Sequence, residues 1–467
     1  MATDGPPVEQ LRGYLLQLAP AKRAQLIAEL ERALLRGDDI PGGDLLLQEV
    51  RSTARENGER APRISAPGRL FFRPLQPFLT DDPSAHKQPA RIARSSLQPL
   101  WDWICRDVLP DIGNRFCEAI KRELESDPAA ACDQFIRPFQ DQVAVRIRAM
   151  LDDLDGNDRA LRRMLGQIGT SAALDEARNL LAILSGRDAL DAMAHRLPEH
   201  IVNLAEAQLE RVKSALDAYA ARPPALWPFA LVLVMGRLAS PWQLIRLAVR
   251  GVDSDEEARI ASTRYAVAVA ITLDDIERMV EELKADLGSG RSVTALLKCI
   301  HDAVRGVRSE LDLGVDSPWS RQLAAIRSEV SSALKIEIES VPGRVRRLLR
   351  PRPDGKSGPA SLDQAEVAET EALIELLQAC RHYASELAVS EVTLRAHSEV
   401  QQYLDTGSRT LVEGLRATAA ADQPFRQSQV DAAVRFCVHV FGRDYAAVLG
   451  KAAGAVINSE RKAAARA

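Results

Sequence analysis

A helical spacing of apolar residues runs through almost the whole of this 467-residue chain and constrains its fold more than any other feature. One stretch shows the spacing clearly, with apolar side chains three or four positions apart at Ile136, Phe139, Val143, Ile147, Met150 and Leu154. Such side chains share one face of a helix. The sequence lacks the strict alternation typical of a half-buried strand, and aromatic residues make up only 4% of it. We therefore predict an all-α protein, either a multi-helix bundle or an elongated helical array.

Two proline-rich stretches interrupt this helical pattern, because proline inside a helix removes a hydrogen bond and clashes with the preceding turn. They divide the chain into five parts. We predict an N-terminal helical module at residues 1–56, a Pro-rich strap at 57–94, a main helical body at 95–341, a basic Pro/Gly linker at 342–360 and a C-terminal helical subdomain at 361–467.

The strap carries three phenylalanines, Phe71, Phe72 and Phe78, which a solvated linker would avoid. We expect an extended segment that lays these rings into grooves of the helical body. The alternative is that the three rings bind a partner. The only motif nearby, Pro74-Leu-Gln-Pro77, has no basic residue at the flanking offset that is usual in polyproline ligands.

Three short signals indicate helix starts. Ser240-Pro-Trp242 and Ser317-Pro-Trp319 place a serine at the N-cap and a proline at the first helical position. Ser254-Asp-Glu-Glu257 matches a capping box, in which Glu257 would reach back to the start of a long helix.

Composition limits compartment and partners. The net charge of −4 argues against generic nucleic-acid binding by the whole chain. The six cysteines form no C-x-x-C pair, which favours a reducing compartment with free thiols. The N-terminus does not read as a signal peptide, and the longest apolar run, 225–235, is too short to span a bilayer. We expect a cytoplasmic protein.

One basic run stands out in the predicted linker, formed by Arg344, Arg346, Arg347, Arg350 and Arg352. Val345, Leu348 and Leu349 interleave with these arginines, so the run is amphipathic and of the kind that contacts anionic lipid, nucleic acid or an acidic partner. The alternative is a solvated linker whose arginines pair with acidic helix faces.

His301-Asp302 is the sequence's best candidate for metal chemistry. The surrounding apolar stripe, centred on Ile300 and Val304, puts His301 at its edge and Asp302 on the solvated face. We therefore expect a surface pair, and we predict no metal site, no cofactor and no catalytic residues. Phosphate-binding, zinc-protease and serine-hydrolase motifs are missing from the sequence.

These observations favour a soluble helical protein that acts through protein–protein contacts as a scaffold, adaptor or regulator, without catalysis. Its partner would be another protein or a second copy of itself. Two alternatives stay open: a metal-assisted hydrolase with its site near His301, and a peripheral membrane protein that uses the basic run at residues 344–352. No motif places the chain in a known family.

Overall fold

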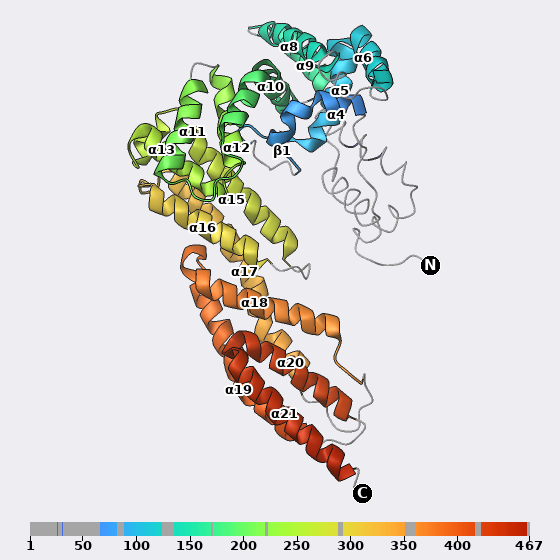
Figure 1. Cartoon of the computed structure of the whole chain (residues 1–467), viewed down its shortest axis with the longest axis vertical. Helices are drawn as coiled ribbons and strands as arrows, with labels where there is room; N and C mark the ends of the chain where they lie inside the picture. The colour runs from blue at the N-terminus through green and yellow to red at the C-terminus, as the bar shows by residue number, and fades with distance from the viewer. Residues whose placement is uncertain are drawn as a thin grey trace. The chain divides into compact units, whose positions relative to one another are not determined.

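The computed structural model describes Leu26, Leu30 and residues 66–81, 88–123, 135–154, 156–169, 171–219, 223–287, 293–350, 360–415 and 422–464. These residues are almost entirely helical (Figure 1), which confirms the all-α prediction. Their one sheet joins two very short strands in parallel, β1 (Leu79–Thr80) and β2 (Ile92–Ala93), with Leu79 opposite Ile92. The predicted N-terminal module lies outside the described residues, apart from Leu26 and Leu30.

The chain forms two compact units. Unit 1 comprises Met1–Ile201 and Ala205–Arg237, and unit 2 comprises Val202–Leu204 and Leu238–Ala467. The division falls inside residues 95–341, which the sequence predicted as one body. The chain passes from one unit to the other after helices α10 and α12 have ended.

The described residues of unit 1 form eight α-helices, with α10 at the centre, besides short 3₁₀ and π segments. In chain order its helical elements are α4 (Ala66–Phe71), η1 (Arg73–Phe78), η2 (Arg94–Ser96), α5 (Leu97–Trp103), η3 (Ile104–Val108), α6 (Pro110–Glu123), α8 (Arg137–Asp152), α9 (Asp158–Ile168), α10 (Ser171–Arg196), α11 (Glu206–Tyr219), η5 (Pro224–Leu226) and α12 (Trp227–Met235). The central helix is α10, which contacts α8, α9, α11, α12 and η1.

The part of the strap that carries the three phenylalanines is helical, which corrects the expectation of an extended segment there. It folds as α4 followed by the 3₁₀ helix η1. Pro67 and Pro74 do not prevent this, because they lie in the first turn of their helices, where a backbone N–H has no intrahelical acceptor. Pro77 lies inside η1, near its end. Burial of the strap's phenylalanines then holds these two short helices in place.

Helix α12 is apolar on all sides and has no exposed face. Seven of its nine residues are buried, so α12 is a core helix of unit 1. Within the part of the chain that the structure describes, no helix is long and apolar enough to cross a membrane.

Unit 2 is built from longer helices. In chain order they are η6 (Pro241–Gln243), α13 (Leu244–Val252), α14 (Glu257–Ala261), α15 (Ala266–Asp286), α16 (Thr294–Glu310), α17 (Pro318–Leu349), α18 (Gln364–Leu387), α19 (Ser390–Gly414), α20 (Gln423–Phe441) and α21 (Arg443–Ala464). The 32-residue helix α17 contacts α15 and also α18, α19 and α20, so it joins the two halves of this unit.

Helix α17 continues through Pro342 to Leu349, which corrects the predicted linker at residues 342–349. The physical reason is its apolar stripe, since Ile338, Val341 and Val345 are all buried. This burial outweighs the hydrogen bond that Pro342 cannot donate. The rest of the predicted linker, residues 351–359, lies outside the described residues.

The start of α17 has two caps. The Ser317 hydroxyl accepts a hydrogen bond from the Ser320 N–H at 3.1 Å, as its N-cap signal predicts. The buried carboxylate of Glu257 accepts from the backbone N–H of Gly314 at 3.1 Å and of Trp319 at 3.4 Å. Glu257 therefore does not close a capping box with Ser254, and the long helix predicted there is split into α14 and α15.

Candidate binding groove

The three strap phenylalanines are buried in the core of unit 1, as the sequence predicts. Phe71, Phe72 and Phe78 are 0%, 2% and 1% exposed. The ring centroid of Phe71 lies 5.4 Å from that of Trp101 and 5.5 Å from that of Phe139, while Phe78 lies 5.0 Å from Phe229 on α12. Because the chain's own residues cover these rings, a partner could reach them only if the cluster opened. Their role in partner binding stays a prediction.

The basic run faces glutamates of unit 2. Arg344 bonds to Glu369 on α18 at 2.6 Å, and Arg346 bonds to Glu399 on α19 at 2.8 Å. Arg347 pairs with Glu366.

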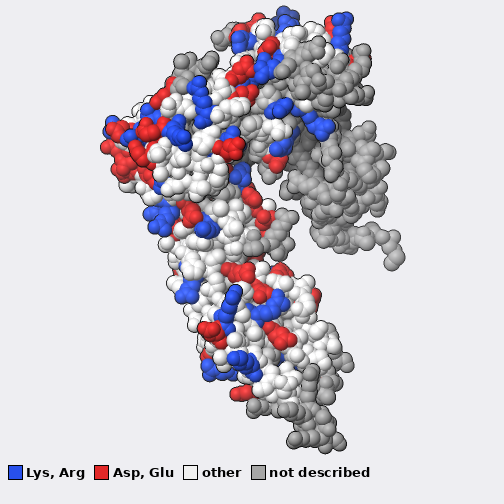
Figure 2. All heavy atoms as spheres, viewed as in Figure 1, with Lys and Arg blue, Asp and Glu red and all other residues white. Residues whose placement is uncertain are grey.

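Arg350 follows the end of α17, and its backbone carbonyl accepts from the Gln429 side chain at 2.9 Å. Arg352 lies outside the described residues. The pairing of the first three arginines is the alternative that the sequence left open, with acidic helix faces as partners. On the face shown in Figure 2, basic and acidic side chains are interspersed in the same way.

His301 is buried rather than at the surface, which corrects one sequence-based expectation. Its side chain is covered by Tyr383 of α18, with the two ring centroids 4.5 Å apart. The His301 Nδ1 lies 3.0 Å from Asp302 Oδ1. A search of the described ranges finds no group of three or more His, Cys, Asp or Glu residues that could hold a metal ion.

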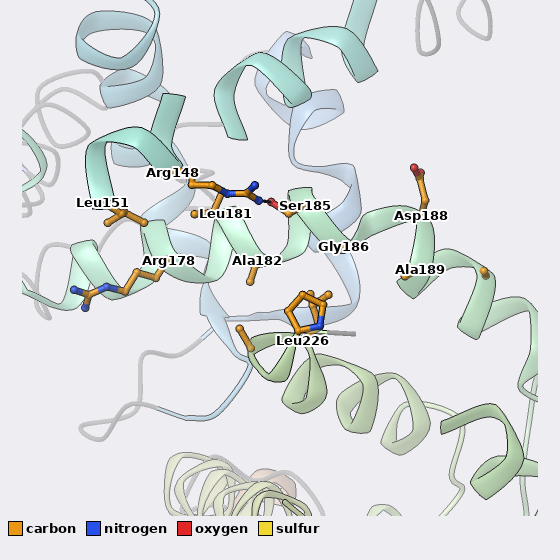
Figure 3. A pocket seen from close by; sticks show the side chains of 13 residues that line it. Arg148, Leu151, Arg178, Leu181, Ala182, Ser185, Gly186, Asp188, Ala189 and Leu226 are labelled. Carbon is orange, nitrogen blue, oxygen red and sulfur yellow. Dashed lines mark hydrogen bonds between the residues drawn. The ribbon is translucent and has the colours of Figure 1, made fainter. Parts of the chain in front are cut away.

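A hollow that could take a ligand lies on unit 1, between α8, α10 and the segment that leads into α12 (Figure 3). Its volume is ≈ 640 Å³. We call it the α10 groove. It is lined by Arg148, Leu151, Arg178, Leu181, Ala182, Ser185, Gly186, Asp188, Ala189, Ala192, Pro223, Ala225 and Leu226.

Small side chains of α10 form the floor of the α10 groove. Ala182, Gly186 and Ala189 recur at spacings of four and three, so they share one face of the helix. Gly186 lets Leu226 pack directly against the α10 backbone, which closes one end of the floor. This site was not predicted from the sequence. The available signal was this row of small residues, on a helix that also carries several leucines.

Charges at the edge of the groove are unevenly balanced. The Arg148 guanidinium of α8 donates to the Ser185 hydroxyl at 2.9 Å, so its partner in the groove is neutral (Figure 3). Arg178 pairs with Asp175 on its own helix at 2.8 Å.

Asp188, the carboxylate in the lining, is bonded by Arg137 at 3.0 Å. Arg187 lies 3.8 Å from the same carboxylate oxygen. The nearer partner of Arg187 is Asp141 at 2.8 Å, so the Asp188 charge is matched mainly by Arg137. The Arg148 charge is left to attract an anion. An apolar floor with a cation at its edge suits a ligand that is itself apolar and acidic.

Comparison with known proteins gives no relative: no family model, no curated protein and no solved structure matches this chain. The α10 groove and its chemistry are therefore the best indication of function.

Proposed function

We propose that this chain is a non-catalytic binding protein of the cytoplasm, a scaffold, adaptor or regulator, and that the α10 groove is where it binds its partner. The occupant is an amphipathic helix of another protein that presents small apolar side chains and a carboxylate. The observation that carries the proposal is the combination of an apolar floor in a hollow of ≈ 640 Å³ with Arg148, whose partner there is a neutral hydroxyl.

The small residues of α10 support a helix as the occupant. The distance between packed helices depends on the side chains at their contact, and alanine and glycine allow the closest approach. An amphipathic helix laid in an apolar groove is also a recurring mode of peptide recognition. Ala182 and Ala189 are both half-buried, so they offer apolar surface that a ligand can still cover.

Charge complementarity supports a carboxylate on that helix. Arginine forms two parallel hydrogen bonds with a carboxylate, a stronger contact than its single bond to a hydroxyl. An acidic side chain at the edge of the groove would therefore replace Ser185 as the partner of Arg148. A basic partner would be repelled.

The test uses a displayed library of amphipathic helical peptides, selected against the full-length chain. Ala182→Leu and Ala189→Leu together fill the floor of the groove, and Arg148→Glu reverses its charge. We expect selected peptides to be enriched in Asp or Glu next to small apolar residues, and a synthetic copy of the best peptide to lose at least tenfold in affinity on either change. Val145→Ser, at a 69% exposed position of α8, is the matched control and should leave binding unchanged.

The proposal fails if the filled variant selects the same peptides with the same affinity, while circular dichroism shows that the variant is folded. If the filled variant instead changes only self-association, seen by sedimentation, a second copy of the chain is the occupant.

One observation weighs against each of the other two predictions. His301, the suggested hydrolase centre, is only 9% exposed and lies beneath Tyr383. Arg344 and Arg346, the suggested lipid contacts, bond to glutamates.

A further inference from the structure

Two cysteines of unit 1 that do not line the α10 groove lie side by side. Cys105 belongs to the π-helix η3, and Cys117 belongs to the following helix α6. Their side chains are hydrogen-bonded to each other. The sequence predicts free thiols, because none of the six cysteines lies in a C-x-x-C motif, and it does not predict that these two meet.

The packing of α6 on η3 gives an independent reason for this proximity. Gly113 of α6 lies so close to η3 that a β-carbon placed on it would be 3.4 Å from Cys105 Sγ and 3.1 Å from Cys105 Cα. Cys117 comes four residues after Gly113, one turn further along the same face of the helix. The face of α6 that carries Cys117 is therefore the face that rests on Cys105.

Both thiols are also reachable from solvent, since Cys105 and Cys117 are each half-buried. The remaining described cysteines differ from this pair. Cys380 and Cys437 are buried, and Cys299 is exposed on α16 in unit 2.

We propose that Cys105 and Cys117 are a redox-modification site, a dithiol that a small disulfide such as oxidised glutathione converts reversibly into an intramolecular disulfide. One thiolate attacks a sulfur of oxidised glutathione, forms a mixed disulfide and releases one glutathione thiolate. The second thiolate attacks the protein sulfur of that mixed disulfide, forms the Cys105–Cys117 bond and releases the second glutathione. The two protein thiols lose two electrons and two protons, and oxidised glutathione gains the two electrons.

The environment makes this pair slow to react at neutral pH. The hydrogen bond to Cys117, burial and the neighbouring charges raise the pKa of Cys105 well above that of a free thiol. Since the thiolate is the attacking species, formation of the disulfide should speed up as the pH rises. Transient disulfides of this kind act as redox sensors in otherwise reducing compartments.

The bond would fasten α6 to the aromatic cluster of unit 1. Phe116, next to Cys117, stacks on Phe139 with ring centroids 4.1 Å apart. Trp101, four residues before Cys105, lies 6.2 Å from Phe116. Oxidation would therefore tie together two elements that hold the rings over the strap.

The experiment incubates the folded full-length chain with oxidised glutathione until modification no longer increases with time, at a concentration at which Cys299 carries glutathione. Free thiols are then blocked, and tryptic peptides are analysed by mass spectrometry. Trypsin yields peptide 95–106 with Cys105 and peptide 116–121 with Cys117. We expect these two peptides joined and lighter by two hydrogens than their sum, and released by dithiothreitol.

Two variants sharpen the result. Cys117→Ser should leave a stable glutathione adduct on Cys105 and no joined peptides, whereas Cys299→Ser should leave the joined peptides unchanged. Three results obtained while Cys299 is modified would overturn the proposal. Cys105 and Cys117 could both remain unmodified, they could each carry glutathione, or they could be joined to Cys132 and not to each other.

Discussion

Gly186 and Leu226 are in contact so close that no other residue fits at position 186 without a shift. A β-carbon added to Gly186 would lie 2.5 Å from both δ-carbons of Leu226 and 3.1 Å from its γ-carbon. Leu226 is itself 3% exposed, so its side chain has little room to turn away. This contact fixes η5 against α10 at the end of the α10 groove.

Replacing Gly186 with alanine should therefore destabilise the protein, although alanine favours helix by about 1 kcal/mol over glycine. Overpacking a filled core costs about 1–3 kcal/mol, and we expect this loss to prevail. Urea unfolding would measure it. Gly166→Ala on α9 is the matched control, because a β-carbon there meets no atom within 4 Å, and it should be neutral or stabilising.

A double variant tests whether Leu226 is the cause. Leu226→Ala alone should cost about 2–5 kcal/mol through the cavity it leaves. In that background Gly186→Ala should no longer be destabilising, because its methyl group occupies vacated space. If the two losses simply add, another contact explains the effect of the first change.

A second prediction concerns Glu257, whose carboxylate accepts hydrogen bonds from two backbone N–H groups at the start of α17. Glu257→Ala leaves both donors without this acceptor and should cost about 1–3 kcal/mol of unfolding free energy. Glu257→Gln keeps one acceptor oxygen and should lose less. Glu256→Ala, at the exposed neighbouring position, should change stability little, and an equal loss at both positions would contradict the cap.

The sequence predicted those parts of the fold that depend on local pattern. The apolar spacing, the N-cap at Ser317 and the burial of Phe71, Phe72 and Phe78 are all local consequences of residue type and position. The predicted linker at residues 342–349 was wrong because proline is a local signal for a helix end. The apolar stripe that keeps α17 helical there packs on other helices, which the sequence does not show.

The site was harder to predict, because each of its features depends on residues far apart in the chain. Gly186 reads as a helix-weakening residue until Leu226 is seen against it, 40 positions later. Glu257 reads as a local cap until its partners at Gly314 and Trp319 are known. The sequence alone does not specify which α-helical faces meet.

A third prediction concerns pH. Burial and the nearby Arg381 lower the pKa of His397, and an Arg381 Nη1 lies 3.3 Å from His397 Nε2. Arginine can only donate, so Nε2 accepts and the neutral ring carries its proton on Nδ1. In the unfolded chain His397 binds a proton near its ordinary pKa of about 6.5, whereas the folded chain resists this.

The unfolded state therefore binds more protons in that range, and folding stability falls as the pH drops below about 6.5 toward the lowered pKa. His397→Gln should remove this part of the pH dependence. Urea unfolding between about pH 5 and pH 8, roughly the range in which histidine titrates, would then show an unfolding free energy that changes less with pH. His382→Gln, at an exposed position of α18, should leave the slope as it is. Parallel profiles for the parent and His397→Gln would show that His397 does not carry the effect.

The last prediction concerns the strap. Phe78 is 1% exposed and packs edge to face on Phe229 of α12, with ring centroids 5.0 Å apart. Truncating a buried phenylalanine to alanine costs about 3–5 kcal/mol, so Phe78→Ala should loosen η1 from α12 and from α10, which η1 also contacts. Hydrogen exchange should then rise in these three elements.

The control is Phe441→Ala, at a half-buried position of α20, which should lower the free energy of unfolding clearly less. If exchange in η1 and α12 is unchanged in Phe78→Ala, burial of this ring does not hold the strap in place, and its use in binding a partner becomes the better explanation.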